Sequence, residues 1–340
     1  MTIITVGIDL AKNVFAVHGV DQNGKTVLVK PKVSRAALPG LLAGLPPCVI
    51  GMEACSGAHY WARLFRQYGH EPRLMAAKFV SPYRMAGKSG KNDAADAQAI
   101  CEAVLRPHMR FVPVKDESQQ AMQCLHRTRQ GFIEEKTATY NRLRGLVSEF
   151  GIIAPQSPDA LRHIVSEQKS SLPLHVQQCV DDLLKHIDHI EEKITEYDRI
   201  LSRSAKTDHR SQRLMELKGI GPTTACALVA SIGNAHDFKN GRQLAAWLGL
   251  TPSQYSSGGK SKLGRITKAG DSYLRTLLVQ GARSLLIGAD KKTDSFSRWV
   301  CSLVERRGYW RAVVAIAAKN ARLCWASLHY GDDFRLYSAS

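Results

Sequence analysis

The sequence predicts an α/β domain followed by two largely helical regions. Three strand-like segments open the chain, and helix-like and strand-like segments then alternate, which is typical of an α/β sheet of mixed direction. Two long stretches follow in which apolar residues recur at alternating spacings of three and four. The remaining third of the chain has mostly helical patterns. We place the α/β domain at residues 1–112, a helical arm at 113–210 and a helical domain at 211–340.

Alternating apolar residues and turn signals predict the strands of the first domain. Residues 2–9 alternate, and the strand-like residues 14–20 and 26–29 are joined by Asn23-Gly24, a strong hairpin signal. After Pro46-Pro47, residues 48–53 form a short apolar run typical of a buried strand. The pattern further predicts a strand at 71–77 and helices at 35–44, 58–68 and 91–105.

The arm is predicted from two apolar seams. The first comprises Met122, Leu125, Phe132, Leu143, Leu146 and Phe150, and the second Leu183, Ile187, Ile190, Ile194, Tyr197 and Leu201. Residues 151–175 separate the seams, contain three prolines and are expected to form a linker. This pattern predicts an antiparallel coiled-coil arm or a dimerisation element. Two ordinary bundle helices would give the same pattern.

The C-terminal domain is expected to be mostly helical, with helices at about 240–248, 271–287 and 310–328. Residues 217–233, "LKGIGPTTACALVASIG", have the form of a helix-hairpin-helix element. In such a turn Gly219 and Gly221 would let backbone amides approach a phosphate at a helix N-terminus.

The charge balance favours a polyanionic partner. The chain has 47 Lys and Arg against 30 Asp and Glu, a net charge of +17, and each phosphate neutralised by such a surface releases counterions. A ribosome-like structural role and an anionic membrane surface are the alternatives. No apolar run approaches the roughly 20 residues that span a bilayer, and the N-terminus lacks the features of a signal peptide. We therefore expect a cytoplasmic nucleic-acid-binding protein without a membrane partner.

Four carboxylates are the candidate catalytic groups of the first domain. Asp9 and Glu53 end two predicted strands, where ligands of open α/β sheets gather. Asp93 and Asp96 lie three apart on one helical face. Carboxylate oxygens without His or Cys select Mg²⁺ or Mn²⁺, so the set predicts a two-metal phosphoryl-transfer site. Any one of these acids alone would more often be structural.

Residues 254–270, "QYSSGGKSKLGRITKAG", combine three serines and four glycines with positive charges and contain no acid. Lys260, Lys262, Arg265 and Lys268 would hold phosphates on either side of a bound strand. Taken alone, Ser257 could be a turn residue in an ordinary surface loop.

Five blocks in this order resemble one family: "GIDLAKN", "GMEACSGAHYW", "KNDAADAQAI", "LKGIGPTTACALVASIG" and "AAWLGLTPSQYSSGGKSKLGRITKAGD". The family is that of the insertion-sequence transposases with an Asp-Glu-Asp-Asp set, described as bridge-RNA-guided recombinases. The resemblance covers nearly the whole chain. It implies a RuvC-like N-terminal domain of the RNase H superfamily, a coiled coil and a C-terminal transposase domain.

The resemblance also implies roles for individual residues. Asp9, Glu53, Asp93 and Asp96 would coordinate Mg²⁺. The "Y-x-S-G" motif places the nucleophile, which becomes joined to DNA through a phosphoserine, on Ser257, with Ser256 directly beside it. The family works as a homo-oligomer, a dimer or tetramer, in which the serine comes from another subunit. A noncoding guide RNA pairs with target and donor DNA.

Other functions fit parts of the same pattern. A RuvC-like metal-dependent endonuclease would use water and leave no covalent link to DNA, and a nucleic-acid-binding protein could retain an inactive site. The opening "GIDL" is also found in sugar-kinase and Hsp70-like ATPases, but their Gly-rich phosphate hairpins have no counterpart here. We expect a transposase that cuts and rejoins DNA.

Overall fold

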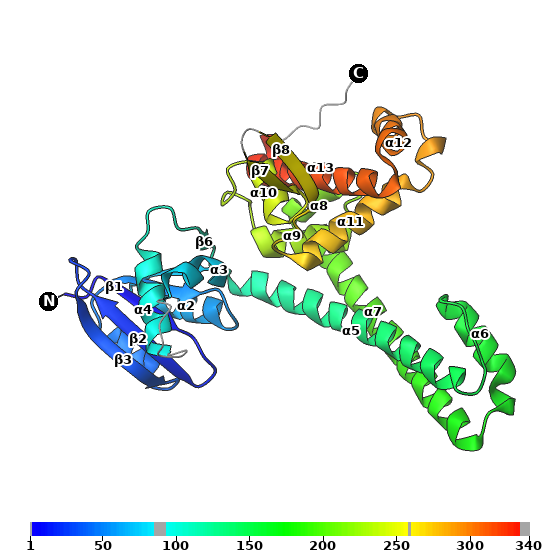
Figure 1. Ribbon diagram of the computed structural model, residues 1–340, viewed down its shortest axis with the longest axis horizontal. Coiled ribbons are helices and arrows are strands. Elements are labelled where there is room, and N and C mark those ends of the chain that lie inside the picture. Colours follow the sequence, from blue (N-terminus) through cyan, green and yellow to red (C-terminus); the bar gives the residue numbers. More distant parts are fainter. Residues whose placement is uncertain (1, 85–92, 258–259, 334–340) are drawn as a thin grey trace. The chain divides into compact units, whose positions relative to one another are not determined.

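We describe the protein from a computed structural model, which covers residues 2–84, 93–257 and 260–333. The chain forms two compact units, Met1–Glu117 and Ser118–Ser340. Figure 1 shows the first in blue to cyan and the second from green to red. Within the described residues no helix is both long enough and apolar enough to cross a membrane.

The first unit is built on a mixed sheet, which confirms the predicted α/β sheet of mixed direction. Its described residues form six strands in the order β3-β2-β1-β4-β5-β6. The central strands β1, β4 and β5 are parallel, whereas β2, β3 and β6 pair antiparallel to their neighbours. The bounds are β1 Thr5–Asp9, β2 Val14–Val20, β3 Thr26–Ser34, β4 Val49–Glu53, β5 Glu71–Met75 and β6 Phe111–Val112.

Helices cover both faces of this sheet. On one face α1 (Leu38–Ala43) and α2 (Ala58–Gln67) bury Leu42, Trp61 and Phe65 with Ile8 of β1. On the other face lies α4 (Asp93–Val104), whose Ile100 and Val104 form a separate cluster with Val80 of the short helix α3 (Ala77–Val80). Because alternate residues of β1 face opposite sides, both helical layers contact the same strand.

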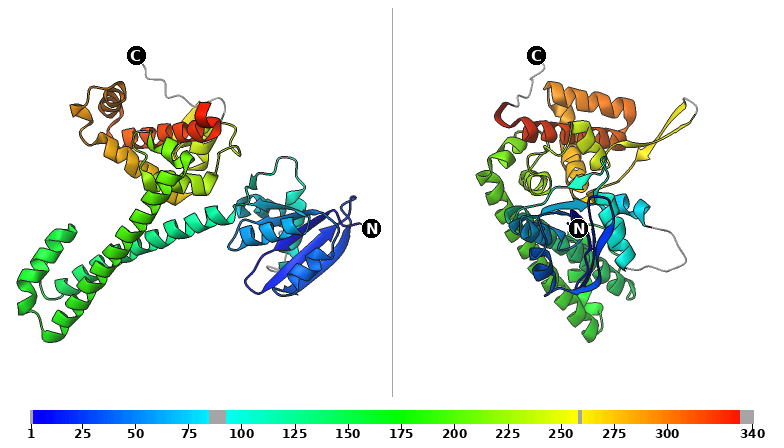
Figure 2. Two further views of the ribbon diagram at one scale, coloured as in Figure 1. Left: turned by 180° about the vertical axis from the view of Figure 1, so that it is seen from behind. Right: turned by 90° about the vertical axis from the view of Figure 1, so that its left-hand side faces the viewer.

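The arm of the second unit consists of two long antiparallel helices, α5 (Glu117–Ser148) and α7 (Leu174–Thr207), which lie side by side in Figures 1 and 2. Arg129 pairs with Asp198, and Tyr140 lies against Glu191 further along. The helical pair was predicted, but part of the first seam was wrong. Leu146 and Phe150 are exposed.

The expected linker at 151–175 is also wrong over much of its length, because it contains α6 (Pro158–Gln168). Ser157 caps this helix by accepting a hydrogen bond from the Ala160 N–H, and Pro158 occupies the first turn, where proline is tolerated. Leu161 and Val165 are buried against the end of α5. The proline therefore begins a helix here.

The C-terminal part of the second unit is a helical domain around one core, and the three helices predicted there are confirmed. The helices are α8 (His209–Met215), α9 (Pro222–Ile232), α10 (Gly241–Trp247), α11 (Ser272–Leu286), α12 (Ser295–Arg307) and α13 (Tyr309–Tyr330). The serine stretch, expected to be a loop, instead forms the hairpin β7 (Pro252–Ser257) and β8 (Lys260–Ile266). Gly258-Gly259 between two strands is a hairpin signal that the sequence prediction overlooked.

Candidate functional site

Two of the four predicted carboxylates end adjacent parallel strands. Asp9 is the last residue of β1 and Glu53 the last residue of β4, and Ile8 pairs with Met52 directly before them. The carboxyl ends of parallel strands meet at one edge of a sheet. The strand pairing therefore brings both side chains to the same edge.

Glycines let α4 bring the other two carboxylates to this edge. A Cβ at Gly7 of β1 would lie 2.2 Å from the Ala97 carbonyl oxygen and 2.4 Å from the Cys101 nitrogen. Gly51, its register partner on β4, faces Val104 in the same way, with 2.9 Å between the two Cβ positions. The helix backbone thus lies directly on the strands. Its first turn, which carries Asp93 and Asp96, can then reach the strand ends.

The electrostatics of Asp9 reflect the other three acids. Burial and, after it, the negative charges of Asp96, Asp93 and Glu53, in that order, together raise the pKa of Asp9 to about 6. Asp96 is itself buried. Like charges disfavour ionisation when they are close, so Asp96, Asp93 and Glu53 all lie near enough to act on Asp9.

Arg84 is a member of this cluster that sequence reasoning missed. Its Nη2 donates to Glu53 Oε1 at 3.2 Å, and its Nε lies 2.9 Å from Asp96 Oδ1. Its positive charge opposes the rise in the pKa of Asp9. Arg84 follows a short 3₁₀ turn at Ser81–Tyr83, and nothing in its sequence context marks it as a partner of distant acids.

The donor set suits a hard divalent cation. Carboxylate oxygens are the ligands that Mg²⁺ and Mn²⁺ prefer, and a cation would offset the negative charges that, after burial, raise the pKa of Asp9. As the described side chains stand, no group of three Asp, Glu, His or Cys residues is gathered closely enough to hold a metal ion. The guanidinium of Arg84 pairs with two of the acids, Glu53 and Asp96, and partly neutralises them.

Ser257, the predicted nucleophile, is the last residue of β7 and pairs with Lys260 across the hairpin. The side chains of Ser257 and Lys260 lie outside the described part, as do residues 258–259. The neighbouring Ser256 is described, and its Oγ accepts a hydrogen bond of 2.7 Å from Gln254 Nε2.

The other cations of the serine stretch are exposed. Lys262 and Arg265 lie on β8, and Lys268 follows it in a left-handed conformation with φ of 52°. Among the described residues none of the three is paired with a carboxylate. Tyr255 and Leu263 are exposed beside them. The hairpin thus presents positive charge together with apolar surface.

The two glycines of the predicted helix-hairpin-helix differ in their surroundings. Gly219, with φ of 81°, packs against α11, where an added Cβ would lie 2.7 Å from Leu285 Cδ1 and 2.9 Å from the Gly281 oxygen. Its close packing accounts for glycine at this position. Gly221 is exposed at the start of α9, with open space around it, and is the better placed of the two for a phosphate contact.

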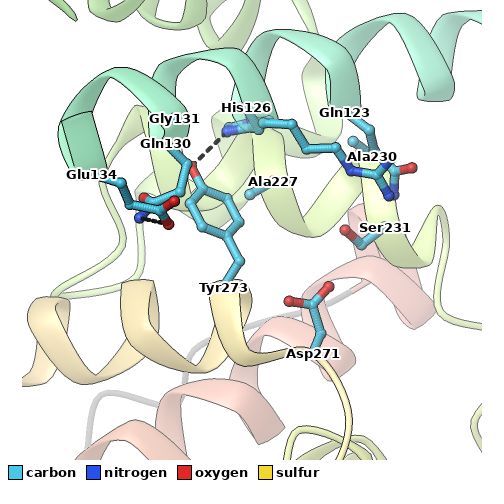
Figure 3. A pocket seen from close by; sticks show the side chains of 11 residues that line it. Gln123, His126, Gln130, Gly131, Glu134, Ala227, Ala230, Ser231, Asp271 and Tyr273 are labelled. Carbon is cyan, nitrogen blue, oxygen red and sulfur yellow. Dashed lines mark hydrogen bonds between the residues drawn. The ribbon is translucent and has the colours of Figure 1, made fainter.

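A pocket of about 380 Å³ in the second unit was not anticipated (Figure 3). His126 of α5, only 3% exposed, forms a hydrogen bond of 3.0 Å through Nδ1 with the Tyr273 hydroxyl of α11. Burial, with Arg129 nearby, lowers the pKa of His126 to about 4. The histidine is therefore neutral at pH 7, and it joins the arm to the helical domain.

Two family models match parts of the chain. A family model described as "Transposase" matches residues 6–152, and another described as "Transposase IS116/IS110/IS902 family" matches residues 211–298.

Relatives named as transposases match nearly the whole chain. A "Probable family 20 transposase" of Pseudomonas aeruginosa is 45% identical over 340 residues, covering 98% of this chain and 99% of that protein. The "Transposase for insertion sequence element IS1111A" of Coxiella burnetii is 39% identical, covering 97% and 91% respectively. The "Transposase for insertion sequence element IS1328" of Yersinia enterocolitica is 38% identical, covering 97% and 98%. The chain belongs to the IS116/IS110/IS902 family of DEDD transposases.

Proposed function

We propose that this protein is an insertion-sequence transposase that cuts and rejoins DNA through a phosphoserine intermediate. The observation that carries this proposal is the set of Asp9, Glu53, Asp93 and Asp96 near one edge of the sheet, where burial and then the other three acids raise the pKa of Asp9. We further propose that the mixed sheet with its acids at the strand ends is an RNase H-like, RuvC-like domain.

In the proposed reaction the Ser257 hydroxyl attacks a DNA phosphorus. The Oγ–P bond forms as the P–O3′ bond breaks, the hydroxyl proton is lost, and the departing 3′ oxygen takes up a proton. Mg²⁺, held by the four carboxylates when bound, would polarise the phosphate and help to ionise the serine. Lys262, Arg265 and Lys268 hold the flanking phosphates. A free 3′ hydroxyl then attacks the phosphoserine and releases Ser257, so rejoining needs no ATP.

The carboxylates and Ser257 belong to different units of the chain, so the reaction requires that both reach the same phosphate. We propose that they do so in a homo-oligomer, with Ser257 supplied by another subunit. A guide RNA would supply base specificity by pairing, and the protein would then read mainly backbone and shape. The surplus of positive charge, +17, supports binding to both nucleic acids.

The test is a search for a denaturant-resistant protein–DNA adduct. Purified protein is incubated with Mg²⁺, element-junction DNA, the flanking noncoding transcript and labelled target. Wild type should give the adduct and Ser257→Ala should not, whereas Ser256→Ala is the matched control and should retain it. Cleavage that persists without any adduct in Ser257→Ala would instead support the nuclease that uses water.

A mixing experiment tests the shared site. Asp9→Asn and Ser257→Ala should each be inactive alone, because each lacks one half of the chemistry. If the serine comes from another subunit, a mixed oligomer can combine Ser257 of an Asp9→Asn subunit with the intact carboxylates of a Ser257→Ala subunit. Part of the adduct should then form again. Mixed oligomers that form but give no adduct would contradict supply of the serine by another subunit.

A further inference from the structure

Two large aromatic side chains are exposed where α12 ends and α13 begins. Trp310 is 65% exposed and Tyr309 is 42% exposed. Their ring centroids lie 5.1 Å apart, with the ring planes nearly perpendicular at 87°. Rings of this size normally contribute buried area to a core or an interface, so an exposed pair indicates a surface that contacts something else.

Arginines lie on both sides of this pair in the sequence, and another lies near one of its rings. Arg306 and Arg307 form the last turn of α12, Arg311 follows in α13, and all three are exposed. The guanidinium carbon of Arg283, on α11, lies 5.7 Å from the centre of the Trp310 ring. None of these four arginines pairs with a carboxylate in the described part of the chain. This part of the surface thus combines arginines that have no carboxylate partner among the described residues with exposed aromatic rings on which other rings can stack.

We propose that this aromatic–arginine surface, comprising Arg283, Arg306, Arg307, Tyr309, Trp310 and Arg311, binds single-stranded nucleic acid by stacking bases on its rings. The matched family models end at residue 298, before five of these six residues. Arginine binds the phosphates of such a strand, and an aromatic face stacks on a base. In a duplex, neighbouring base pairs already cover both faces of each base, so a single strand fits better.

The positive charge of the aromatic–arginine surface argues against a second copy of this chain as its binding partner. Protein interfaces are depleted of charge at their centres. Here four unpaired arginines would have to be desolvated against another subunit that carries the same positive charge. A polyanion neutralises them instead, and it releases counterions as it binds.

The test uses full-length Ser257→Ala protein in EDTA, so binding is measured without cleavage. Probes are labelled oligo(dT) and oligo(rU) of about ten nucleotides, within the length that one groove binds, and a duplex of the same length. Trp310→Ala should weaken single-strand binding about five- to a hundred-fold and change duplex binding much less. Trp310→Phe keeps a stacking ring and should retain most of the affinity. Ile287→Ala, which alters another highly exposed side chain of this unit, should have no effect.

Photo-crosslinking localises the contact independently of folding effects. Iodouracil-substituted oligo(dT) and oligo(rU) should crosslink to the peptide that contains Tyr309 and Trp310. Tighter binding of oligo(rU) identifies RNA as the strand, and tighter binding of oligo(dT) identifies DNA. Unchanged affinity in Trp310→Ala with crosslinks elsewhere would overturn the proposal. If sedimentation of that variant also showed fewer subunits, the rings would belong to a contact between copies.

Discussion

Replacing Arg84 by alanine should destabilise the first unit when no divalent cation is present. Among the described residues Arg84 is the cation that pairs with Glu53 and with Asp96, at 3.2 and 2.9 Å. Without it these carboxylates lose their compensating charge and add more repulsion to Asp9. The ion pairs should therefore contribute more than ordinary surface pairs do.

The size of the stability loss in Arg84→Ala follows from how far Arg84, Glu53 and Asp96 are buried. Glu53 and Asp96 are 16% and 11% exposed, whereas Arg84 is 39% exposed. Exposed ion pairs contribute up to about 1 kcal/mol, and breaking a buried pair costs about 3–5 kcal/mol. We expect an intermediate loss of about 2 kcal/mol. For a unit of this size the loss corresponds to a fall in Tm of about 10 °C.

Differential scanning calorimetry in EDTA and in increasing Mg²⁺ measures this loss. Mg²⁺ should narrow the difference in Tm between variant and wild type. A ligand that binds only the folded protein stabilises it, and the variant should gain more because Arg84 no longer neutralises Glu53 and Asp96. Arg73→Ala is the matched control: Arg73 pairs with Glu71 at 2.8 Å, with side-chain exposures of 34% and 63%. It should cost less than about 1 kcal/mol at any Mg²⁺ concentration. Equal melting of Arg84→Ala and wild type in EDTA, or a gap that Mg²⁺ leaves unchanged, would refute the reasoning.

Two further predictions concern packing and pH. Gly7→Ala should displace α4 and lower the free energy of unfolding of the first unit by about 3 kcal/mol, as measured by urea denaturation. Gly40→Ala is the control and should leave the stability unchanged, because its Cβ meets no atom within 4 Å. His126 has a folded-state pKa of about 4, below its ordinary value, so the unfolded chain takes up the proton. The neutral His126 therefore contributes about 3 kcal/mol to the free energy of unfolding above about pH 6.5, and this contribution is lost as the pH falls toward 4. His126→Gln should flatten the pH dependence of the free energy of unfolding, although Arg129 and Tyr273 still face the site. His186→Gln, at an exposed position, should leave that pH dependence unchanged.

The four acids could be predicted because their signals are local. Asp9 and Glu53 each end an apolar run, and Asp93 and Asp96 have helical spacing, so strand ends and helix periodicity place them without knowledge of the fold. Arg84 could not be predicted this way. Its contacts with Glu53 and Asp96 depend on where β4 and α4 lie relative to each other in the folded domain, and local sequence patterns do not reveal this.

Proline and glycine account for the local errors. The prolines of 151–175 suggested a linker, yet Pro158 begins α6, because a proline in the first turn has no helical N–H partner to lose. In the serine stretch the glycines suggested a flexible loop, whereas Ser257 and Lys260, which flank Gly-Gly in the sequence, pair as residues of two antiparallel strands. In both cases the position of the residue within the element decided its effect, and composition alone did not reveal that position.

Burial and the neighbouring acids keep the pKa of Asp9 raised even though Arg84 lowers it. One guanidinium carries a single positive charge, whereas the cluster contains four carboxylates, so Arg84 leaves most of the repulsion in place. Gly7 and Gly51 let α4 pack directly on the sheet, which keeps Asp93 and Asp96, in the first turn of α4, near the strand ends. The packing of the domain therefore keeps an excess of negative charge at the strand ends, and a divalent cation with its higher charge relieves it better than Arg84 does.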